Sequence, residues 1–515
     1  MNSVKKIVFS CLLFGRMIFQ SSVFAQAHNP IIHADVPDMS MVRVGDTYYM
    51  SSTTMHMSPG VPVMSSKDLI NWKLESYCYD TLVNNDAMNL DKGQSTYGRG
   101  SWASCIRYHN GEFIINTFAA TSGKTHNFRS KDIKGPWTEQ TFKPAYHDQT
   151  IFFDDDGKVY MIYAAGRLKI LELKPDLSGL MPGVEEKVLI ENASAPAGDN
   201  IMLGAEGSQL FKVNGKYYMF NITWPRGGMR TVVIHRADNI NGPWEGKIGL
   251  QDKGVAQGGL IDTPDGRWFA YLFKDNGGVG RIPYLVPVKW ENDWPVLGEN
   301  GKVPMTLDLP ANKSLIPTLV NSDEFNRKTK TLPLQWQWNH NPDNSLWEIQ
   351  KGYLRLKTGR VDTAFVFAKN TLTQRTIGPE SSGSTLLSTK GMKNGDFAGL
   401  CLLQKNYGLV GVKMQDGQKY IVMESVAAGK EEIRIPLTKK KVFFKADCDF
   451  KEGKDLAQFY CSLDGKNWTA VGAPMKMPYT LPHFMGYRFG LFNYATQQTG
   501  GYADFDWFRI SDSIY

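Results

Sequence analysis

A short hairpin pattern recurs through the first part of the chain and restricts its fold more than any other feature. In each copy a turn containing glycine separates two apolar or aromatic runs: RVGDTYYM, YHNGEFII, DDDGKVYMIY, KVNGKYYMF and TPDGRWFAYL. The turn glycines are Gly45, Gly111, Gly157, Gly215 and Gly266. Asn-Gly and Asp-Gly between β-prone runs are typical of β-hairpins.

A second pattern follows several of these hairpins. It reads SSKDLINW, FRSKDIKGPW and HRADNINGPW, and ends at Trp72, Trp137 and Trp244. Two alternating hairpins make four strands, and five such units predict a five-bladed β-propeller. The alternative is a β-sandwich built from many hairpins. Both are all-β folds, as the 49 glycines, 25 prolines and scarcity of helical periodicity also indicate.

The hairpin patterns stop near Asp323, and short alternating strands run from SDEFNRKTK to GYADFDWFRI. These predict a second, sandwich-like β domain. At the N-terminus, two lysines precede a short apolar run and a Val-Phe-Ala cleavage site, which is a signal-peptide pattern. We therefore expect a signal peptide at 1–25, a propeller at 26–315, a linker at 316–322 and a β-sandwich at 323–515.

The signal pattern predicts an exported protein, in the periplasm of a Gram-negative bacterium. No later apolar run is long enough to span a membrane, so membrane insertion is not expected. The net charge of +7 is dispersed without a basic stripe, which argues against a nucleic-acid partner. Cys448 and Cys461 flank a turn, and either pair across it or remain two buried thiols.

Acidic and polar residues occupy equivalent places ahead of the turns. Nine residues before four of the turn glycines stand Trp102, Asp148, Glu206 and Gln257, and Asp38 stands seven before Gly45. In a propeller the first strand of each blade lines the central channel. These five side chains should therefore gather at one mouth of that channel.

Three carboxylates in one pocket repel one another, which raises the pKa of at least one. Glycoside hydrolysis uses such a group: one carboxylic acid protonates the leaving oxygen, and one carboxylate activates water or attacks the sugar. The alternatives are aspartates that cap turns, or a calcium site. The shared register and the absence of an EF-hand-like sequence favour catalysis. Sequence motifs of serine hydrolases, zinc peptidases and P-loop proteins are absent.

At these residues the sequence resembles glycoside hydrolase family 43. NPIIHADVPDMSMVRVGDTYYM, HDQTIFFDDDGKVYMIY and AEGSQLFKVNGKYYMF are similar to its blade motifs. The resemblance implies an inverting mechanism with Asp38 as general base, Glu206 as general acid and Asp148 as pKa modulator. Inversion predicts a separation of roughly 6.5–9.5 Å between base and acid. It further implies Trp102 as a sugar-contacting aromatic and Arg281 as a substrate-binding arginine.

Many members of this family carry a histidine where Gln257 stands, and that histidine helps to hold a central metal ion. Because Gln257 replaces it, we expect no required cofactor, and a structural calcium in the channel is disfavoured. Gln257 is then a substrate-binding residue, or it only forms hydrogen bonds within the channel. His56 and Trp224 are further candidates for the substrate-binding wall, or else have structural roles.

The sequence is similar to the exo-acting members that carry a concanavalin-like β-sandwich after the propeller. This implies removal of terminal α-L-arabinofuranosyl residues from plant polysaccharide side chains. The alternatives are a β-xylosidase with the same three acids, or a non-catalytic glycan-binding propeller. The expected partner is an oligo- or polysaccharide with arabinofuranosyl or xylosyl ends. The second domain is expected to stabilise the propeller, with a pocket-wall loop or sugar binding as alternatives.

Overall fold

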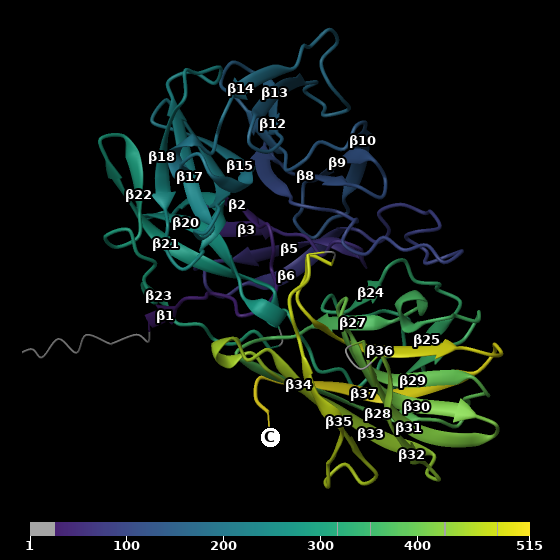
Figure 1. Cartoon of the computed structure of the whole chain (residues 1–515). Coiled ribbons are helices and arrows are strands. Elements are labelled where there is room, and N and C mark those ends of the chain that lie inside the picture. Colours follow the sequence, from purple (N-terminus) through teal and green to yellow (C-terminus); the bar gives the residue numbers. More distant parts are fainter. Residues whose placement is uncertain (1–25, 317, 351, 427–428, 482, 515) are drawn as a thin grey trace, which may run out of the picture.

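The computed structural model describes residues 26–316, 318–350, 352–426, 429–481 and 483–514. The predicted signal peptide lies outside these residues. The described chain forms 37 strands and four short 3-10 helices, arranged as two bodies: a propeller and a β-sandwich (Figure 1). The predicted fold class, a five-bladed propeller followed by a concanavalin-like sandwich, is confirmed. No helix among the described residues has the length and apolar character needed to cross a membrane.

Five four-stranded antiparallel sheets make the blades, each from strands in sequence order. The first holds β2 (Ser40–Val44), β3 (Thr47–Ser51), β5 (Gly60–Ser66) and β6 (Lys73–Tyr79). The second holds β7 (Cys105–His109), β8 (Glu112–Ala119), β9 (Lys124–Ser130) and β10 (Thr138–Phe142). The third holds β11 (Thr150–Phe153), β12 (Val159–Tyr163), β13 (Leu168–Leu173) and β14 (Lys187–Ile190).

The remaining two blades follow the same plan. The fourth holds β15 (Ile201–Val213), β16 (Lys216–Pro225), β17 (Thr231–Ala237) and β18 (Glu245–Leu250). The fifth holds β19 (Ala256–Asp262), β20 (Trp268–Asp275), β21 (Arg281–Glu291) and β22 (Trp294–Leu297). A two-stranded sheet joins β1 (Gln26–His28) to β23 (Thr306–Pro310), so the two ends of the propeller segment meet.

The recurring glycines occupy the hairpin turns between the first and second strands of the blades. Gly111 between β7 and β8 has a φ of +81°, and Gly157 between β11 and β12 also has +81°. Glycine adopts this left-handed conformation without the steric cost that a Cβ imposes. The turn chemistry therefore fixes where each first strand ends, and with it the register of the residues that precede the strand.

Two sheets form the second body. One has eight strands in the order β32-β31-β30-β29-β36-β27-β24-β4, and the other seven in the order β25-β26-β37-β28-β33-β34-β35. Their bounds are β24 (Gln337–Asn339), β25 (Trp347–Gln350), β26 (Tyr353–Lys357), β27 (Leu372–Arg375), β28 (Glu380–Ser388), β29 (Asp396–Leu403), β30 (Gly408–Gln415), β31 (Gln418–Ser425), β32 (Lys430–Pro436), β33 (Lys441–Asp449), β34 (Leu456–Ser462), β35 (Thr469–Lys476), β36 (Arg488–Ala495) and β37 (Tyr502–Ser511). The 3-10 helices are Ala195–Ala197, Gly277–Val279, Phe365–Phe367 and Lys451–Gly453.

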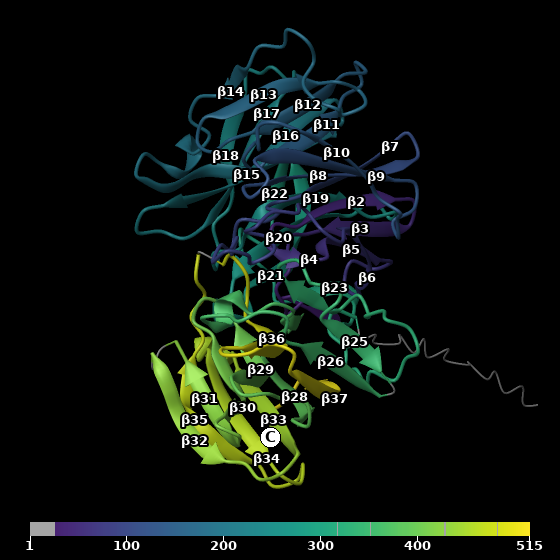
Figure 2. The ribbon, with the colours of Figure 1, turned by 90° about the vertical axis from the view of Figure 1, so that its right-hand side faces the viewer.

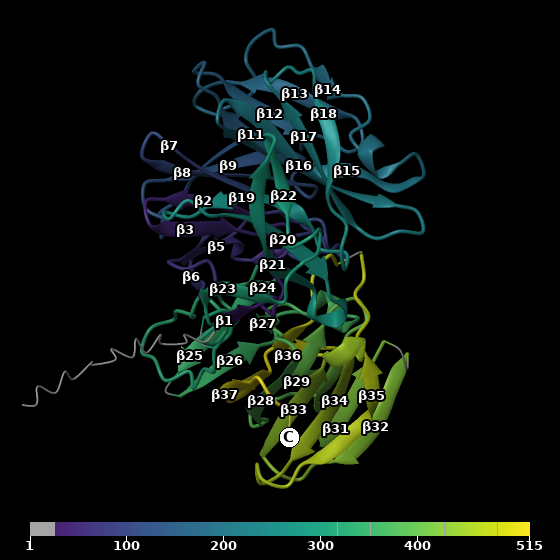
Figure 3. The same cartoon turned by 90° about the vertical axis from the view of Figure 1, so that its left-hand side faces the viewer.

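The two bodies are joined through shared backbone pairing as well as side-chain packing, and they stay adjacent in both turned views (Figure 2, Figure 3). Strand β4 (Met57–Ser58) leaves the first blade and pairs with β24 at the edge of the eight-stranded sheet. The carboxylate of Asp35 accepts hydrogen bonds from the backbone N–H of Arg281 in β21 and of Gly486 in the sandwich. The sandwich segment before β36 is thus fastened to the fifth blade.

The cysteine alternatives are resolved at this level. Cys448 lies in β33 opposite Ala457, and Cys461 lies in β34 opposite Phe444, so the two do not face each other. Both are buried free thiols. The hairpin disulfide is therefore excluded in this structure, and the buried-thiol alternative holds.

Candidate active site

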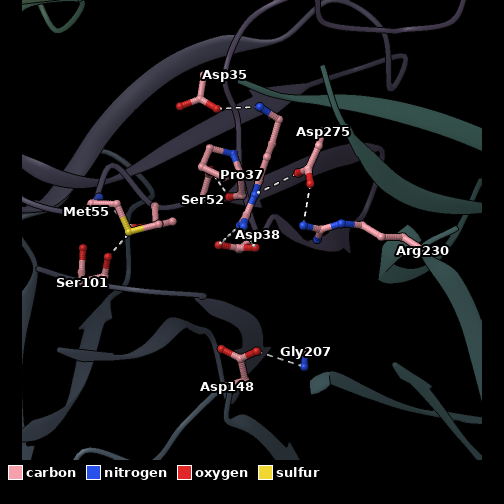
Figure 4. A network of polar contacts seen from close by, with 12 residues as sticks. Asp35, Pro37, Asp38, Ser52, Met55, Ser101, Asp148, Gly207, Arg230 and Asp275 are labelled. Carbon is pink, nitrogen blue, oxygen red and sulfur yellow. Dashed lines mark hydrogen bonds and ion pairs between the residues drawn. The ribbon is translucent and has the colours of Figure 1, made fainter. Parts of the chain in front are cut away.

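Three of the five register positions share an unusual backbone conformation. Asp38 and Asp148 each stand two residues before the first strand of a blade, and Gln257 is the second residue of β19. Their φ angles are 49°, 47° and 55°, in the left-handed region that non-glycine residues rarely adopt. Such strain persists where the surrounding structure enforces it, commonly at functional sites. The carboxylates of Asp38 and Asp148 face each other across an open space (Figure 4).

Glu206 is presented by a distorted part of the fourth blade. It lies in β15, whose pairing with β16 shifts register on both sides of Glu206. Bulges of this kind re-aim a side chain at the edge of an active site. The next residue, Gly207, has a φ of +63°, and its N–H donates a hydrogen bond to Asp148 Oδ2 at 3.1 Å. The carboxylate of Asp148 is thereby held next to Glu206, because it binds the backbone N–H of the residue that follows Glu206.

Asp38 is buried against a single cation. Arg281 Nη1 donates to both of its oxygens, at 2.7 Å to Oδ1 and 2.9 Å to Oδ2. Burial raises the pKa of Asp38; Arg281 opposes that rise, and the negative charges of Glu206 and Asp275 add to it. A carboxylate whose pKa lies above the ordinary range is a stronger base toward a bound water.

A chain of charges extends from this pair toward the fourth blade. Arg281 Nε lies 3.3 Å from Asp275 Oδ1, and Arg230 Nη2 lies 2.5 Å from Asp275 Oδ2. The Arg230 guanidinium in turn lies 5.1 Å from the centre of the Trp224 ring. Trp224 is half-buried, and its indole N–H donates to the carbonyl of Gly228. Trp224 therefore borders the site through Arg230, with its own polar atom already engaged.

Asp148 is buried beside the other two acids. Its carboxyl group is 6% exposed, and burial raises its pKa to about 7, with the negative charges of Glu206 and Asp38 acting in the same direction and His147 opposing them. At neutral pH this carboxyl group exchanges its proton readily. A carboxyl group in that state can change the proton affinity of the neighbouring Glu206, as the role predicted for Asp148 requires.

His147 completes the cluster and was missed by reasoning from the sequence. Its Nε2 lies 3.0 Å from Glu206 Oε2 and 3.7 Å from Asp148 Oδ2. Burial lowers the pKa of His147, but the hydrogen bond to Glu206 and the charges of Asp148, Glu206 and Asp38 outweigh it and raise the pKa to about 9. The only local signal in the sequence is its position directly before Asp148, because the histidines of the chain show no metal-ligand spacing.

The sandwich supplies one wall of the site. The Phe484 ring lies 4.5 Å from the Trp102 ring, edge to face, and 5.7 Å from the Arg281 guanidinium. The indole N–H of Trp102 and the hydroxyl of Tyr479 are buried and have no hydrogen-bond partner among the described residues. Aromatic faces next to unused donors suit a sugar, which has an apolar face and a rim of hydroxyls. These contacts support the pocket-wall loop, which the sequence offered as an alternative to a purely stabilising second domain.

His56 lies elsewhere. It is fully buried, its Nδ1 accepts from the Gly98 N–H, and its ring contacts His340 and Tyr97 between the propeller and the sandwich. No surface of His56 is open to a sugar in this structure, and its substrate-binding role stays a prediction. Its structural alternative fits, because the residue packs in the junction between the two bodies.

Gln257 borders a small cavity below the acids. The cavity measures about 10 Å³ and is also lined by Asp38, Asp148, Gln149 and Gln209. That volume suits one water molecule. Both oxygens of Asp38 accept from Arg281, and the side-chain oxygens of Gln149 and Gln209 accept from hydroxyl groups.

Calcium requires six to eight oxygen ligands. The oxygens of Asp38, Gln149 and Gln209 that line this cavity already accept hydrogen bonds, so they do not provide that number. The donor atoms of His147, Asp148 and Glu206 lie within 4.8 Å of one another. We assign no metal to that cluster, because an ion there would compete with the proton that Glu206 needs. The expectation that no cofactor is required stays a prediction.

Comparison with known proteins agrees with this geometry. The family model "Glycosyl hydrolases family 43" matches residues 27–295, and "Beta xylosidase C-terminal Concanavalin A-like domain" matches residues 322–511. A β-xylosidase of Formosa agariphila is 28% identical over 93% of this chain and 89% of its own length. A non-reducing end α-L-arabinofuranosidase of Bacteroides ovatus is 30% identical over 66% of each chain.

Solved structures extend the comparison. A bifunctional GH43-CE protein of Bacteroides eggerthii is 64% identical with a TM-score of 0.94; the match covers 96% of this chain but 64% of that one. An engineered GH43 enzyme with endo-xylanase and exo-arabinofuranosidase activity is 28% identical with a TM-score of 0.84, over 95% and 100% of the two chains. The chain described here belongs to glycoside hydrolase family 43.

Proposed function

We propose that this protein is an exported, inverting exo-glycoside hydrolase that removes terminal pentosyl residues, xylosyl or arabinofuranosyl, from plant polysaccharides. The observation that carries the proposal is a group of three carboxylates whose negative charges act on one another: Asp38, Asp148 and Glu206, with Asp38 paired to Arg281 and Glu206 to His147. A glycan-binding propeller has no need of a carboxylate pair in two different environments.

In this proposal Asp38 acts as the general base and Glu206 as the general acid. Asp38 takes a proton from a water molecule, and that water attacks the anomeric carbon. Glu206 gives its proton to the departing glycosidic oxygen as the carbon–oxygen bond breaks, and Asp148 adjusts the proton affinity of Glu206 through their negative charges. Arg281 keeps Asp38 ionised and oriented before the step. Since the water and the leaving group lie on opposite faces of the sugar, the product has inverted configuration.

The wall that the sandwich builds supports exo-action. Phe484 closes the space beside Trp102 and Arg281, so a sugar seated there meets protein instead of a further chain. Such a pocket accepts the non-reducing end of an oligosaccharide, and the rest of the chain extends toward solvent. The same geometry disfavours an open groove for internal cleavage.

The two pentoses remain the competing substrates. The match to the β-xylosidase of Formosa agariphila spans more of this chain than the match to the arabinofuranosidase, 93% against 66%. This supports xylosides as the first substrates to test, with α-L-arabinofuranosides second, the reverse of the order suggested by the sequence motifs. Export to the periplasm rests on the signal-peptide pattern of residues 1–25 alone.

The proposal is tested by measuring kcat/KM of the full chain on aryl β-xylopyranoside, aryl α-L-arabinofuranoside and unsubstituted xylo-oligosaccharides. Single pentoses released one at a time support exo-action; early release of larger fragments contradicts it. The matched variants are Glu206→Gln and Glu191→Gln, the latter an exposed glutamate outside the site. Glu206→Gln should lose roughly 10²–10⁴-fold of the rate on oligosaccharides, because general acid catalysis contributes that much. Equal activity of both variants would remove Glu206 from the mechanism.

A further inference from the structure

His147 stands between the buried acids and solvent. Its Nε2 faces two carboxylate oxygens, Glu206 Oε2 at 3.0 Å and Asp148 Oδ2 at 3.7 Å, while 47% of its side chain is exposed. When Nε2 carries a hydrogen, as it does in an imidazolium, this nitrogen can donate it to Glu206 Oε2. The other face of the ring meets water.

The position of His147 is fixed by its surroundings. The Phe118 ring of β8 packs edge to face against the imidazole at 5.5 Å, and the Ala164 N–H after β12 donates to the His147 carbonyl at 3.0 Å. The charged groups that act on His147 are Glu206 from β15, Asp148 beside it in the chain and Asp38 before β2. All three are acidic, so the environment favours an imidazolium.

We propose that His147 is the positioning residue of the general acid: its imidazolium donates Nε2–H to Glu206 Oε2 and so confines the acidic proton of Glu206 to Oε1. This rests on the proposed function, because it assigns a partner to the acid of that reaction. A carboxyl group whose second oxygen is already occupied by a donor has one place left for its proton. That proton is then presented to the glycosidic oxygen.

The same contact acts during bond cleavage. As the carbon–oxygen bond breaks, the Oε1 proton moves to the leaving oxygen and Glu206 becomes a carboxylate. The imidazolium next to Oε2 stabilises this new negative charge, which Asp148 and Asp38 would otherwise oppose. Glu206 regains its proton from water after the product leaves, and Asp38 releases the proton that it took from the nucleophilic water, so the protons balance over the cycle. The negative charges of Asp148 and Asp38 also act on His147 and raise its pKa, which favours the cation.

Two variants separate a charge effect from a packing effect. His147→Gln keeps a donor but no charge, and His147→Phe keeps a ring but no donor. The matched control is His109→Gln, because His109 ends β7 at the opposite end of a first strand and stacks on Phe153. Each is compared with the wild type by its pH profile of kcat/KM, on xylobiose and on an aryl pentoside with a good leaving group.

In both His147 variants, the alkaline limb of the pH profile of kcat/KM should shift to higher pH by about one unit. A neighbouring cation favours the ionised form of an acid, so its removal lets Glu206 keep its proton to higher pH. The loss on the disaccharide should be about a hundredfold for His147→Phe and about tenfold for His147→Gln, with less than threefold loss on the activated aryl substrate. His109→Gln should match the wild type.

An unmoved alkaline limb in both His147 variants, or an equal loss on good and poor leaving groups, would overturn the assignment. If the wild type itself turns over no pentoside, the proposed function fails instead, and the two failures are therefore distinguishable. Folding of each variant is checked by its thermal midpoint. As a direct readout, ¹⁵N-histidine spectra should show a His147 signal, identified by its loss in His147→Gln, that titrates well above pH 6.5. A midpoint at or below that value would also contradict the proposal.

Discussion

Arg281 and Asp38 form a buried ion pair, in which one guanidinium nitrogen, Nη1, lies 2.7 and 2.9 Å from the two carboxylate oxygens. The guanidinium lies between the rings of Phe273 and Phe484, 5.2 and 5.7 Å from their centres. The base candidate is thus oriented by one cation, whose position depends on both the propeller and the sandwich.

Removing that cation should impair both activity and folding. Arg281→Ala leaves Asp38 buried without a counter-charge, and breaking such a pair typically costs about 3–5 kcal/mol. Without Arg281 the pKa of Asp38 rises further, so the acidic limb of the kcat/KM profile should move to higher pH. Arg281→Lys keeps the charge and should show a smaller shift. An acidic limb that is the same in all three proteins would contradict the role of Arg281.

Asp148 predicts a pH-dependent stability. Its pKa in the folded protein, about 7, lies above its ordinary value of 3.8, so the stability linked to its protonated form is present below pH 4 and is lost as pH rises through 7. Asp148→Asn cannot ionise and avoids this loss, which is on the order of a few kcal/mol. Urea unfolding should show the variant more stable than the wild type at pH 8 and equal to it near pH 4. A constant difference across that range would refute the prediction.

Position 207 requires glycine for two reasons: its left-handed backbone conformation and the close approach of the Gln257 side chain. A Cβ on it would lie 2.8 Å from the Gln257 side chain, at a φ of +63°. Gly207→Ala should therefore displace the N–H that binds Asp148, and lower kcat/KM at least tenfold. Gly215→Ala is the matched control, with a φ of +80° and nothing within 4 Å of the new Cβ, so it carries only the backbone cost of roughly 1–2 kcal/mol. Adding Gln257→Ala should restore part of the activity to Gly207→Ala; no restoration would count against the clash.

The sandwich wall predicts that a residue far along the chain contributes to binding the sugar. Phe484→Ala opens the space beside Trp102 and should lower kcat/KM by about tenfold or more, mainly through KM, because a lost apolar contact is worth roughly 1–3 kcal/mol. Leu481→Ala, on the same segment but 57% exposed, should leave the kinetics unchanged. Similar kinetics of the two variants would mean that the sandwich only stabilises the propeller.

The propeller and the register of its acids were predictable because their signals are local. Each turn glycine follows the first strand of a blade, so counting back from it reaches the start of that strand or the residues just before it in successive blades. The left-handed backbone shared by Asp38, Asp148 and Gln257 is the structural counterpart of that count.

What the sequence did not reveal depends on contacts between distant segments. Phe484 reaches the site only because Gly486 is tied to Asp35, and β4 leaves the first blade to pair with the sandwich. From the sequence, His56 is a candidate either for the pocket wall or for a structural role, and this pairing of β4 buries it in the junction between the two bodies. No local pattern in the sequence encodes which loop docks on which blade.

The central claim, that Asp38 and Glu206 act on opposite faces of the sugar, is tested most directly by the configuration of the first product. Proton NMR of wild-type hydrolysis of a β-xyloside, recorded faster than the sugar mutarotates, reports the anomeric signal as it forms. The account predicts α-xylose at the earliest times, with β-xylose appearing only by mutarotation. If β-xylose forms first, configuration is retained and the assignment of Asp38 as a base acting through water is wrong.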